Sequence, residues 1–213
     1  MSAPMVRAIL DGRKFQTRRA LKPQPPSLET VKKRAGIGFN LFDDGTEPGV
    51  WRVAGPVWAV REAPGPVQWR CPYGVPGDRL YVKEAIRRTE CGAEFIADGS
   101  PTKADCWPWK NRALPSMYMP KGLRRITLEI ADVRVERLHS ITEDDARAEG
   151  IAGWPGNYEI EWPGAGGMKG CFSLARDAYR FLWCWINGDG SSSAWDANPW
   201  VWRIAFRRVA PRR

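Results

Sequence analysis

The segment RITLEIADVRVERL, residues 125–138, alternates apolar and polar side chains along most of its length. Leu128 and Ile130 belong to the first part of this pattern, and the alternation resumes at Val133. A period of two residues is typical of a β-strand with one buried face. We therefore predict a long strand here, with a break near residues 131–132 where the alternation slips.

Two helices and a strand are predicted downstream of this segment. Residues 141–151 form the first helix, because Thr142 and Asp145 have the spacing of a capping box at its N-terminus. Residues 174–187 carry apolar side chains at helical spacing, with Ala178, Phe181, Leu182 and Trp185 expected on one face. A last strand is predicted over residues 200–209.

The N-terminal half contains weaker signals. Residues 4–11 have apolar side chains at helical spacing and are followed by Gly12, so they predict a short helix. Residues 13–19 alternate and are expected to be extended, and residues 79–86 predict a strand. Shorter β-like runs are expected at 51–60, 67–71 and 94–97.

Length and element order favour one domain. A chain of 213 residues is closer to one domain than to two. Residues 22–50 predict a long surface excursion, 87–120 an irregular insertion and 153–170 a Gly-rich loop. The order of elements predicts an α+β fold, a compact mixed β-barrel with helices packed on its rim. We expect five side chains to be buried in it: Ile126, Leu128, Ile130, Val201 and Ile204.

The composition points to a basic, aromatic-rich surface. Lys and Arg total 33 against 24 Asp and Glu, which gives a formal net charge of +9, and the chain holds 12 Trp. Arginine pairs with phosphate and stacks on flat rings, so this balance suits nucleotides or nucleic acid. Basic residues on solvated strands would give the same total, and this alternative remains open.

Several classes of protein are disfavoured. No stretch approaches the roughly 18 consecutive apolar residues of a membrane span, and the first residues lack the pattern of a signal peptide. We therefore expect a soluble cytoplasmic protein without a membrane partner. The 5 Cys form no CxxC pair and are expected to be reduced thiols. With His139 as the single histidine, the spacing does not support a zinc site, and no metal or cofactor is expected.

The stretch GRKFQTRR, residues 12–19, holds the first candidate site. Lys14 and Thr17 lie three residues apart, so both side chains reach one pocket only if the chain turns between them. A lysine of lowered pKa would then deprotonate the Thr17 hydroxyl, which activates a weak nucleophile. The alternative is that Lys14 and Arg18 are solvated strand residues.

Three further residues are candidates. Glu149 lies at the C-terminal end of the predicted helix, where the helix dipole disfavours an acid that has no partner. Glu84 either faces the barrel interior or pairs with an arginine. Trp195 either stacks on a base or packs in the core, whereas we expect Trp200 and Trp202 to pack in the core.

The order of short motifs in this chain resembles that of ASCH domains, which belong to the PUA-like superfamily. The resemblance covers most of the chain, and it is fairly specific for the fold and weakly specific for activity. Phe15 is a departure, because the family motif often has a second Thr there. The first matching segment is Ile9–Arg19, which has the pattern IxDGRKxxTxR. The others are Pro76–Leu80, Ile126–Val135, Ile141–Gly150 and the final Trp-rich strand.

This resemblance implies a PUA-like β-barrel with flanking helices, formed by a single domain over residues 1–213. The family's cleft suits a modified base or RNA. Residues 22–70, 87–120 and 153–170 would be insertions, and larger Trp-rich members of this kind resemble proteins encoded by phages and prophages. A bacterial cytoplasm is the implied location.

The resemblance also implies an activity. Some small ASCH proteins are N(4)-acetylcytidine amidohydrolases that use a Lys, a Thr and a Glu, and these fall on Lys14, Thr17 and Glu149. Thr17 would attack the acyl carbon, Lys14 would act as base, and Glu149 would orient the lysine or carry the proton. The substrate-binding candidates are Arg18, Arg19, Glu84 and Trp195.

Two alternatives use the same basic cleft. The chain would be a non-catalytic RNA- or DNA-binding module, or a ribonuclease. In either case we expect nucleic acid to bind along a positive face that includes Arg18, Arg19, Arg124 and Arg125. The acyl group, the base, the choice between nucleoside and polymer, and the oligomeric state remain open.

Overall fold

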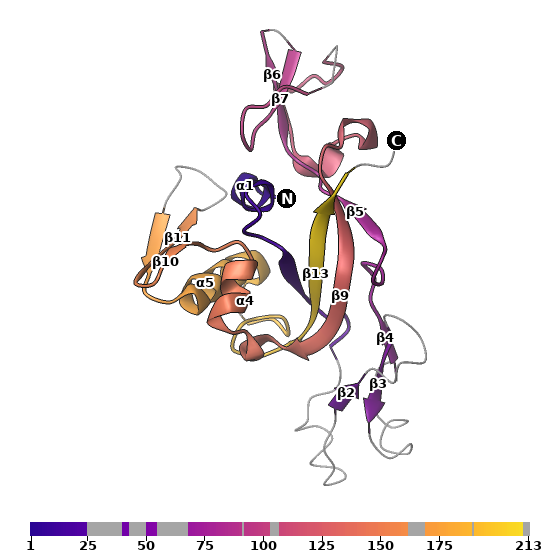
Figure 1. Ribbon diagram of the computed structural model, residues 1–213, viewed down its shortest axis with the longest axis vertical. Helices are drawn as coiled ribbons and strands as arrows, with labels where there is room; N and C mark the ends of the chain where they lie inside the picture. Colours follow the sequence, from indigo (N-terminus) through magenta and orange to yellow (C-terminus); the bar gives the residue numbers. More distant parts are fainter. Residues whose placement is uncertain are drawn as a thin grey trace.

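A curled, antiparallel, four-stranded sheet forms the centre of the molecule (Figure 1). In a computed structural model, its strands lie in the order β1 (Gln16–Ala20), β13 (Trp200–Val209), β9 (Thr127–Arg137) and β5 (Arg79–Tyr81). The sheet bends into a half-barrel. With its antiparallel strands and a few helices, the architecture is compatible with the α+β class. The structure describes residues 1–24, 40–42, 50–54, 68–90, 92–102, 107–161, 169–188 and 190–210.

The two longest strands, β9 and β13, confirm the prediction from residues 125–138. Asp132 pairs with Ala205 and Ile130 pairs with Phe206, so Ala131 is an extra residue in β9. This bulge lies at the predicted break, and it keeps apolar side chains on the buried face on both sides of it. All five predicted core residues are buried: Ile126, Leu128, Ile130, Val201 and Ile204.

Three helices lie on one side of the curled sheet (Figure 1). They are α1 (Ala3–Leu10), α4 (Glu143–Ala148) and α5 (Ala175–Asn187). All three were predicted, although α4 is shorter than expected. Thr142 and Asp145 form the capping box at the start of α4.

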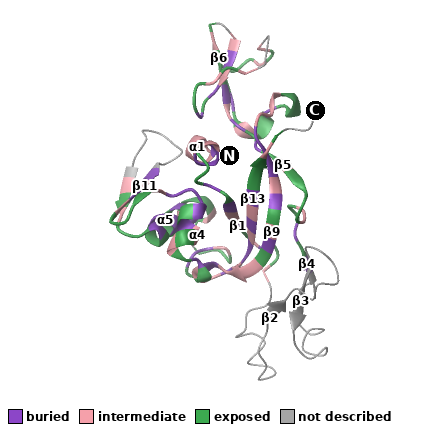
Figure 2. Cartoon of the chain, in the orientation of Figure 1, coloured by how far each residue is buried: buried purple, intermediate pink, exposed green. Residues whose placement is uncertain are grey.

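The main core fills the space between α4, α5 and the sheet, where buried residues gather on the inner faces (Figure 2). The predicted inner face of α5 is partly wrong. Phe181 and Trp185 are exposed, whereas Tyr179 and Trp183 are buried beside Leu182. The helix is rotated because its inner face must also meet Tyr158 and Trp195, which the chain brings in from elsewhere.

The prediction of a Gly-rich loop over residues 153–170 is wrong for the residues described there. β10 (Ala152–Trp154), β11 (Asn157–Glu161) and β12 (Lys169–Phe172) form a three-stranded antiparallel sheet. Gly153 and Gly156 have positive φ and shape the first hairpin. Tyr158 and Ile160 alternate inward from β11, and this period of two outweighs the surrounding glycines.

Residues 86–114 also contain more regular structure than predicted. β6 (Ile86–Thr89), β7 (Gly92–Phe95) and β8 (Ala113–Leu114) form a sheet in the order β7-β6-β8. We call this sheet with residues 107–112 the upper module, because it extends beyond the half-barrel at the top of Figure 1. Ile86, Phe95, Leu114 and Met119 form a small buried cluster in it. The predicted strand over 79–86 is accordingly split, because β5 ends at Tyr81.

A third small sheet contains β2 (Asn40–Phe42), β3 (Val50–Ala54) and β4 (Gln68–Arg70). The expected β-like runs at 51–60 and 67–71 fall partly on these strands, and residues 55–67 lie outside the described part of the chain. Most of the expected excursion over 22–50 also lies outside it. The described helices include none long and apolar enough to cross a membrane. Short 3₁₀ turns occupy Ser116–Tyr118, Lys121–Leu123 and Leu138–Ser140.

Candidate active site

The chain turns sharply between α1 and β1, and this turn carries Lys14 into the interior. Gly12 has a φ of +74°, a left-handed conformation that glycine adopts without strain. The Lys14 amide then donates to Ala8 O at 2.9 Å, and the Phe15 amide donates to Ala148 O at 3.1 Å. These two bonds fix the segment between α1 and α4. The turn at Gly12 precedes Lys14, and residues 14–18 alternate in burial without a turn between Lys14 and Thr17, although both residues line one pocket.

The Lys14 ammonium meets Glu149 inside the protein. Its Nζ lies 3.0 Å from Glu149 Oε2, 2.6 Å from Glu149 O and 3.0 Å from Gln16 O. Both side chains of the ion pair are 4% exposed. An ammonium has three N–H donors, and these three acceptors match them. Glu149 follows the C-terminal end of α4, where an acid needs a cation beside it, and Lys14 is that cation.

Burial is the main influence on the charge of Lys14. Desolvation lowers the pKa of Lys14 below its usual value, and the opposing charge of Glu149 offsets only part of this effect. Arg19 and Arg18 lower the pKa further. A lysine in this environment gives up its proton more readily than one in solvent.

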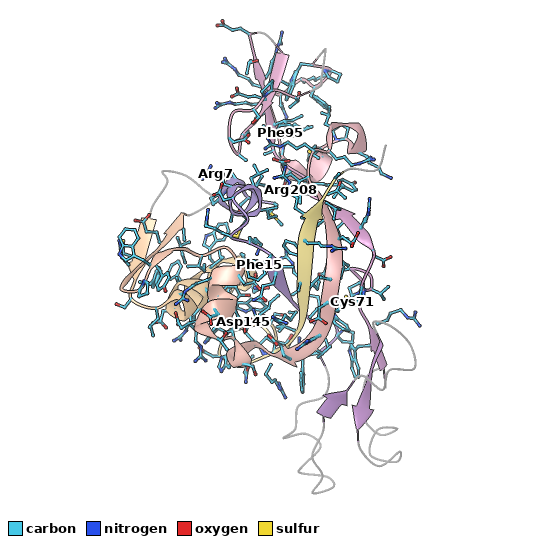
Figure 3. All side chains as sticks on the ribbon, in the orientation of Figure 1. Arg7, Phe15, Cys71, Phe95, Asp145 and Arg208 are labelled. Atoms are coloured by element: carbon cyan, nitrogen blue, oxygen red, sulfur yellow. The ribbon has the colours of Figure 1, made fainter. Side chains whose placement is uncertain are left out.

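Arg18 lies at the centre of a buried network of carboxylates. Its guanidinium is 2.6 Å from Glu136 Oε1, 3.0 Å from Asp145 Oδ2 and 3.5 Å from Glu149 Oε1. The Arg18 side chain is 0% exposed. Figure 3 marks Asp145 on α4, from which it contributes to this network. The expectation that Arg18 belongs to a solvent-facing basic surface is wrong, since strand alternation turns it inward with Gln16.

A pocket of about 340 Å³ opens beside this network. Lys14, Thr17, Arg18 and Glu149 are among its lining residues, and Thr17 is partly exposed. The lining residues from α1 and α5 are largely apolar or aromatic, and we call them the apolar wall. They include Met5, Tyr179, Leu182, Trp183, Trp185 and Ile186.

Tyr179 is a pocket residue that the sequence reasoning missed. It lies on α5, is 4% exposed, and lines the pocket together with the Lys14–Glu149 pair. Burial, helped by the charge of Glu149, raises the pKa of Tyr179 well above its usual value, so the phenol keeps its proton. The available signal was its spacing: Tyr179 lies one helical turn before Leu182 and Trp183.

The remaining predicted site residues fall into two groups. Arg19 is exposed and lines the pocket with Thr17. Glu84 and Trp195 do not line it. Glu84 is fully buried and lies 2.6 Å from Arg125 Nη2, which is the arginine-paired alternative. Trp195 is buried in the main core, where His139 Nε2 lies 2.9 Å from its carbonyl oxygen.

Two other features bear on earlier expectations. Arg125 also binds Asp98, so both Arg18 and Arg125 are occupied by carboxylates and do not form the expected basic face. Phe15, the departure from the family motif, is 52% exposed just before β1 and does not line the pocket (Figure 3). The described residues contain no group of three or more His, Cys, Asp or Glu placed to hold a metal ion.

Comparison with known proteins gives no relative: no protein-family model, no curated protein and no solved structure matches the chain. The functional argument therefore depends on the chemistry of the pocket. A buried lysine–carboxylate pair, a neighbouring hydroxyl and a protonated phenol are groups that acyl-transfer chemistry uses.

Proposed function

We propose that this protein is an amidohydrolase that removes the acyl group from an acylated cytosine nucleoside or a related modified base. One observation carries the proposal: the buried Lys14–Glu149 pair lines a pocket that Thr17 also lines. Desolvation lowers the pKa of Lys14, and a perturbed pKa of a group that lines a pocket is a feature of functional sites.

The proposal extends to family and fold. The motifs that resemble ASCH domains fall on α1 and β1, on the turn before β5, on β9 with α4, and on β13. These elements surround the pocket or build the half-barrel behind it. We therefore interpret the half-barrel as a divergent PUA-like barrel in a single domain, with the three-stranded sheets as insertions.

Proton transfer within the ion pair would generate the base. If the Lys14 ammonium passes a proton to Glu149 Oε2, 3.0 Å away, a neutral amine and a neutral carboxyl result. Burial favours this exchange because it removes two charges from a medium that solvates them poorly. The electron pair left on the Lys14 nitrogen would accept the Thr17 hydroxyl proton once the amine has turned from Glu149 toward Thr17.

The acyl transfer would follow in two halves. As Lys14 accepts its proton, the Thr17 oxygen forms a bond to the acyl carbon, and the bond from that carbon to the exocyclic nitrogen breaks. The nitrogen leaves with the proton held by Lys14, as the free amine. Water, deprotonated by the same Lys14 amine, then attacks the Thr17 ester. This step releases the carboxylic acid and restores the Thr17 hydroxyl.

Tyr179 and the apolar wall would orient the substrate. A phenol that remains protonated donates a hydrogen bond to the acyl oxygen, where negative charge develops. Trp183, Trp185 and Leu182 offer a surface for a flat ring. The volume of about 340 Å³ lies near the lower end of the roughly 300–1,000 Å³ of small-molecule sites, which favours a nucleoside over a larger ligand.

The test is release of the acyl group from N(4)-acetylcytidine and from a panel of other acylated nucleosides. We expect Thr17→Ala to abolish turnover and Thr17→Ser to retain part of it, because serine keeps the hydroxyl. Lys14→Met and Glu149→Gln should each lower turnover by about 10²–10⁴. Thr89→Ala, which changes a threonine in the upper module, is the matched control and should leave the rate unchanged.

Two results would overturn the proposal. Hydrolysis of nothing on the panel, with binding of the same nucleosides retained, would leave a non-catalytic base-binding pocket. Full activity of Thr17→Ala would remove the nucleophile from the mechanism.

A further inference from the structure

The upper module carries a second set of hollows, remote in sequence from the Lys14 pocket. One hollow of about 650 Å³ is lined by β6, β7 and the start of β8, and a second of about 410 Å³ is lined by β6 and residues 107–112. Both include Arg88, Thr89, Glu90 and Arg112, so the two hollows adjoin at these shared residues, and we consider them together as one site. We call it the module groove.

Unpaired cations line the module groove. Arg88, Lys110 and Arg112 are exposed, and within the described part of the chain no carboxylate forms an ion pair with them. This contrasts with Arg18 and Arg125, which form ion pairs with Glu136 and Glu84 respectively. Cations without counter-charges are available to an anionic ligand, and binding then displaces only solvent and salt ions.

Local backbone geometry holds these cations together. The Arg88 amide donates to Arg112 O at 2.8 Å, which fixes β6 against the segment before β8. Ile86, Phe95 and Leu114 anchor the same strands in the buried cluster beneath (Figure 3, where Phe95 is marked). Arg87 pairs with Glu94 across the strands, so one of the two carboxylates of the groove is already neutralised.

A tryptophan of fixed orientation completes the groove. Trp107 lines it and is half-buried, and its Nε1 donates to Asn111 O at 2.8 Å. Its ring meets Trp109 edge-on, with centroids 4.8 Å apart. Because these contacts hold the indole in place, a base that stacks on it does not have to order the side chain first.

We propose that the module groove binds a single-stranded nucleic acid. The unpaired cations fit successive phosphates, and Trp107 fits a base, which is the combination that binds single strands with little sequence preference. A membrane surface fits less well, because the lining residues include no large aliphatic side chain. This inference does not rest on the hydrolase proposal, and either one stands if the other fails.

Fluorescence anisotropy with labelled single-stranded RNA and DNA of about 12 nucleotides tests the inference. Three phosphate contacts predict a slope of log K against log salt of about −2, so affinity should fall about fifteenfold between roughly 50 and 200 mM salt. Arg88→Glu with Arg112→Glu should weaken binding at least about tenfold. Trp107→Ala should weaken it by about fivefold or more, and Trp107→Phe should recover part of the loss.

The matched control reverses two charges elsewhere. Arg176→Glu with Arg180→Glu changes exposed residues of α5 that line neither the module groove nor the Lys14 pocket. It should leave affinity within about twofold. Thermal melting of each variant checks that it is folded.

Four results would overturn the inference. They are absence of binding to either strand, equal losses in the two double variants, equal affinity for a duplex of the same length, and equal affinity for polyglutamate or for vesicles of anionic phospholipid. The first would remove the site, the second would reduce it to net charge, and the last two would assign it to another ligand.

Discussion

Substitutions of the Lys14–Glu149 pair can separate its structural role from the catalytic role that we propose for it. Among the described residues, Glu149 supplies the side-chain counter-charge within hydrogen-bond distance of Lys14. Glu149→Leu removes this charge, but the contacts of Nζ with the backbone oxygens of residues 149 and 16 remain. Breaking one half of a buried ion pair typically costs about 3–5 kcal/mol. In Glu149→Leu, Lys14 limits this cost by losing its proton, because a neutral amine is less costly to bury than an unpaired ammonium. At neutral pH, deprotonating a group of ordinary pKa 10.5 costs at most about 5 kcal/mol.

The opposite change should cost less. Lys14→Met leaves the Glu149 carboxylate with Arg18 Nη1 at 3.5 Å, so the acid keeps a cation. The double variant Lys14→Met/Glu149→Leu removes both charges, and its loss should be smaller than the sum of the single losses by about 1–3 kcal/mol. Urea unfolding of the four proteins at neutral pH measures this coupling. Asp196→Leu breaks an exposed ion pair with Arg180 and, as the control, should change stability by less than about 1 kcal/mol.

Additive losses, within about 0.5 kcal/mol, would refute a shared buried ion pair. If the coupling is found, the double variant becomes the informative enzyme: it should be folded and inactive. For a domain of this size each kcal/mol shifts the melting temperature by about 2–4 °C, so Glu149→Leu should melt roughly 6–20 °C below the parent protein.

Three further predictions follow from neighbouring contacts. The pKa of Lys14 is lowered in the folded state, so between that pKa and 10.5 the folded protein binds fewer protons than the unfolded chain. Lys14 therefore makes the free energy of unfolding rise with pH across this window. Urea unfolding at a series of pH values should show this rise in the parent protein and not in Lys14→Met. Gly150→Ala should destabilise the fold by more than 1 kcal/mol in calorimetry, because φ is +99° and a Cβ would lie 3.0 Å from Ala8 Cβ. Arg125→Gln should cost about 3–5 kcal/mol in urea unfolding by leaving Glu84 buried without its cation, and it should leave the proposed deacylation unaffected in the folded fraction.

Long local patterns were predictable from the sequence. The strands β9 and β13 show a period of two over 11 and 10 residues, and α5 shows a helical period over 13. Such lengths leave little ambiguity, because each pattern is repeated several times. Even the bulge at Ala131 was visible, since a slip in alternation must either turn the apolar face outward or insert a residue.

Short strands were less visible. The hairpins at 152–161 and 86–95 have strands of 3 to 5 residues joined at glycines, so their turns dominate the local composition. Tyr158 and Ile160 provide only one repeat of the pattern. Their burial is decided by α5, which packs over them from a distant part of the chain. Local propensity cannot contain that information.

The candidate site was predictable as a set of residues and not as a geometry. Lys14 and Glu149 are 135 positions apart, so no spacing rule brings them together. The unfavourable place of Glu149 at the end of α4 was a valid signal that a cation had to be near. Arg18 gave no such signal, because an arginine in an alternating strand is expected to be exposed unless acids from other elements surround it.

The arrangement around Arg18 explains how Glu149 can accept a proton without loss of the network. Arg18 makes its shortest contacts with Glu136 and Asp145, at 2.6 and 3.0 Å, and these two acids are 24% and 20% exposed. Its contact with Glu149 is the longest of the three, at 3.5 Å. Neutralising Glu149 therefore leaves the guanidinium fully paired by acids that water also solvates. In the proposed mechanism Lys14 and Glu149 would exchange one proton, and Arg18 would stay close to the carboxyl group of Glu149 throughout.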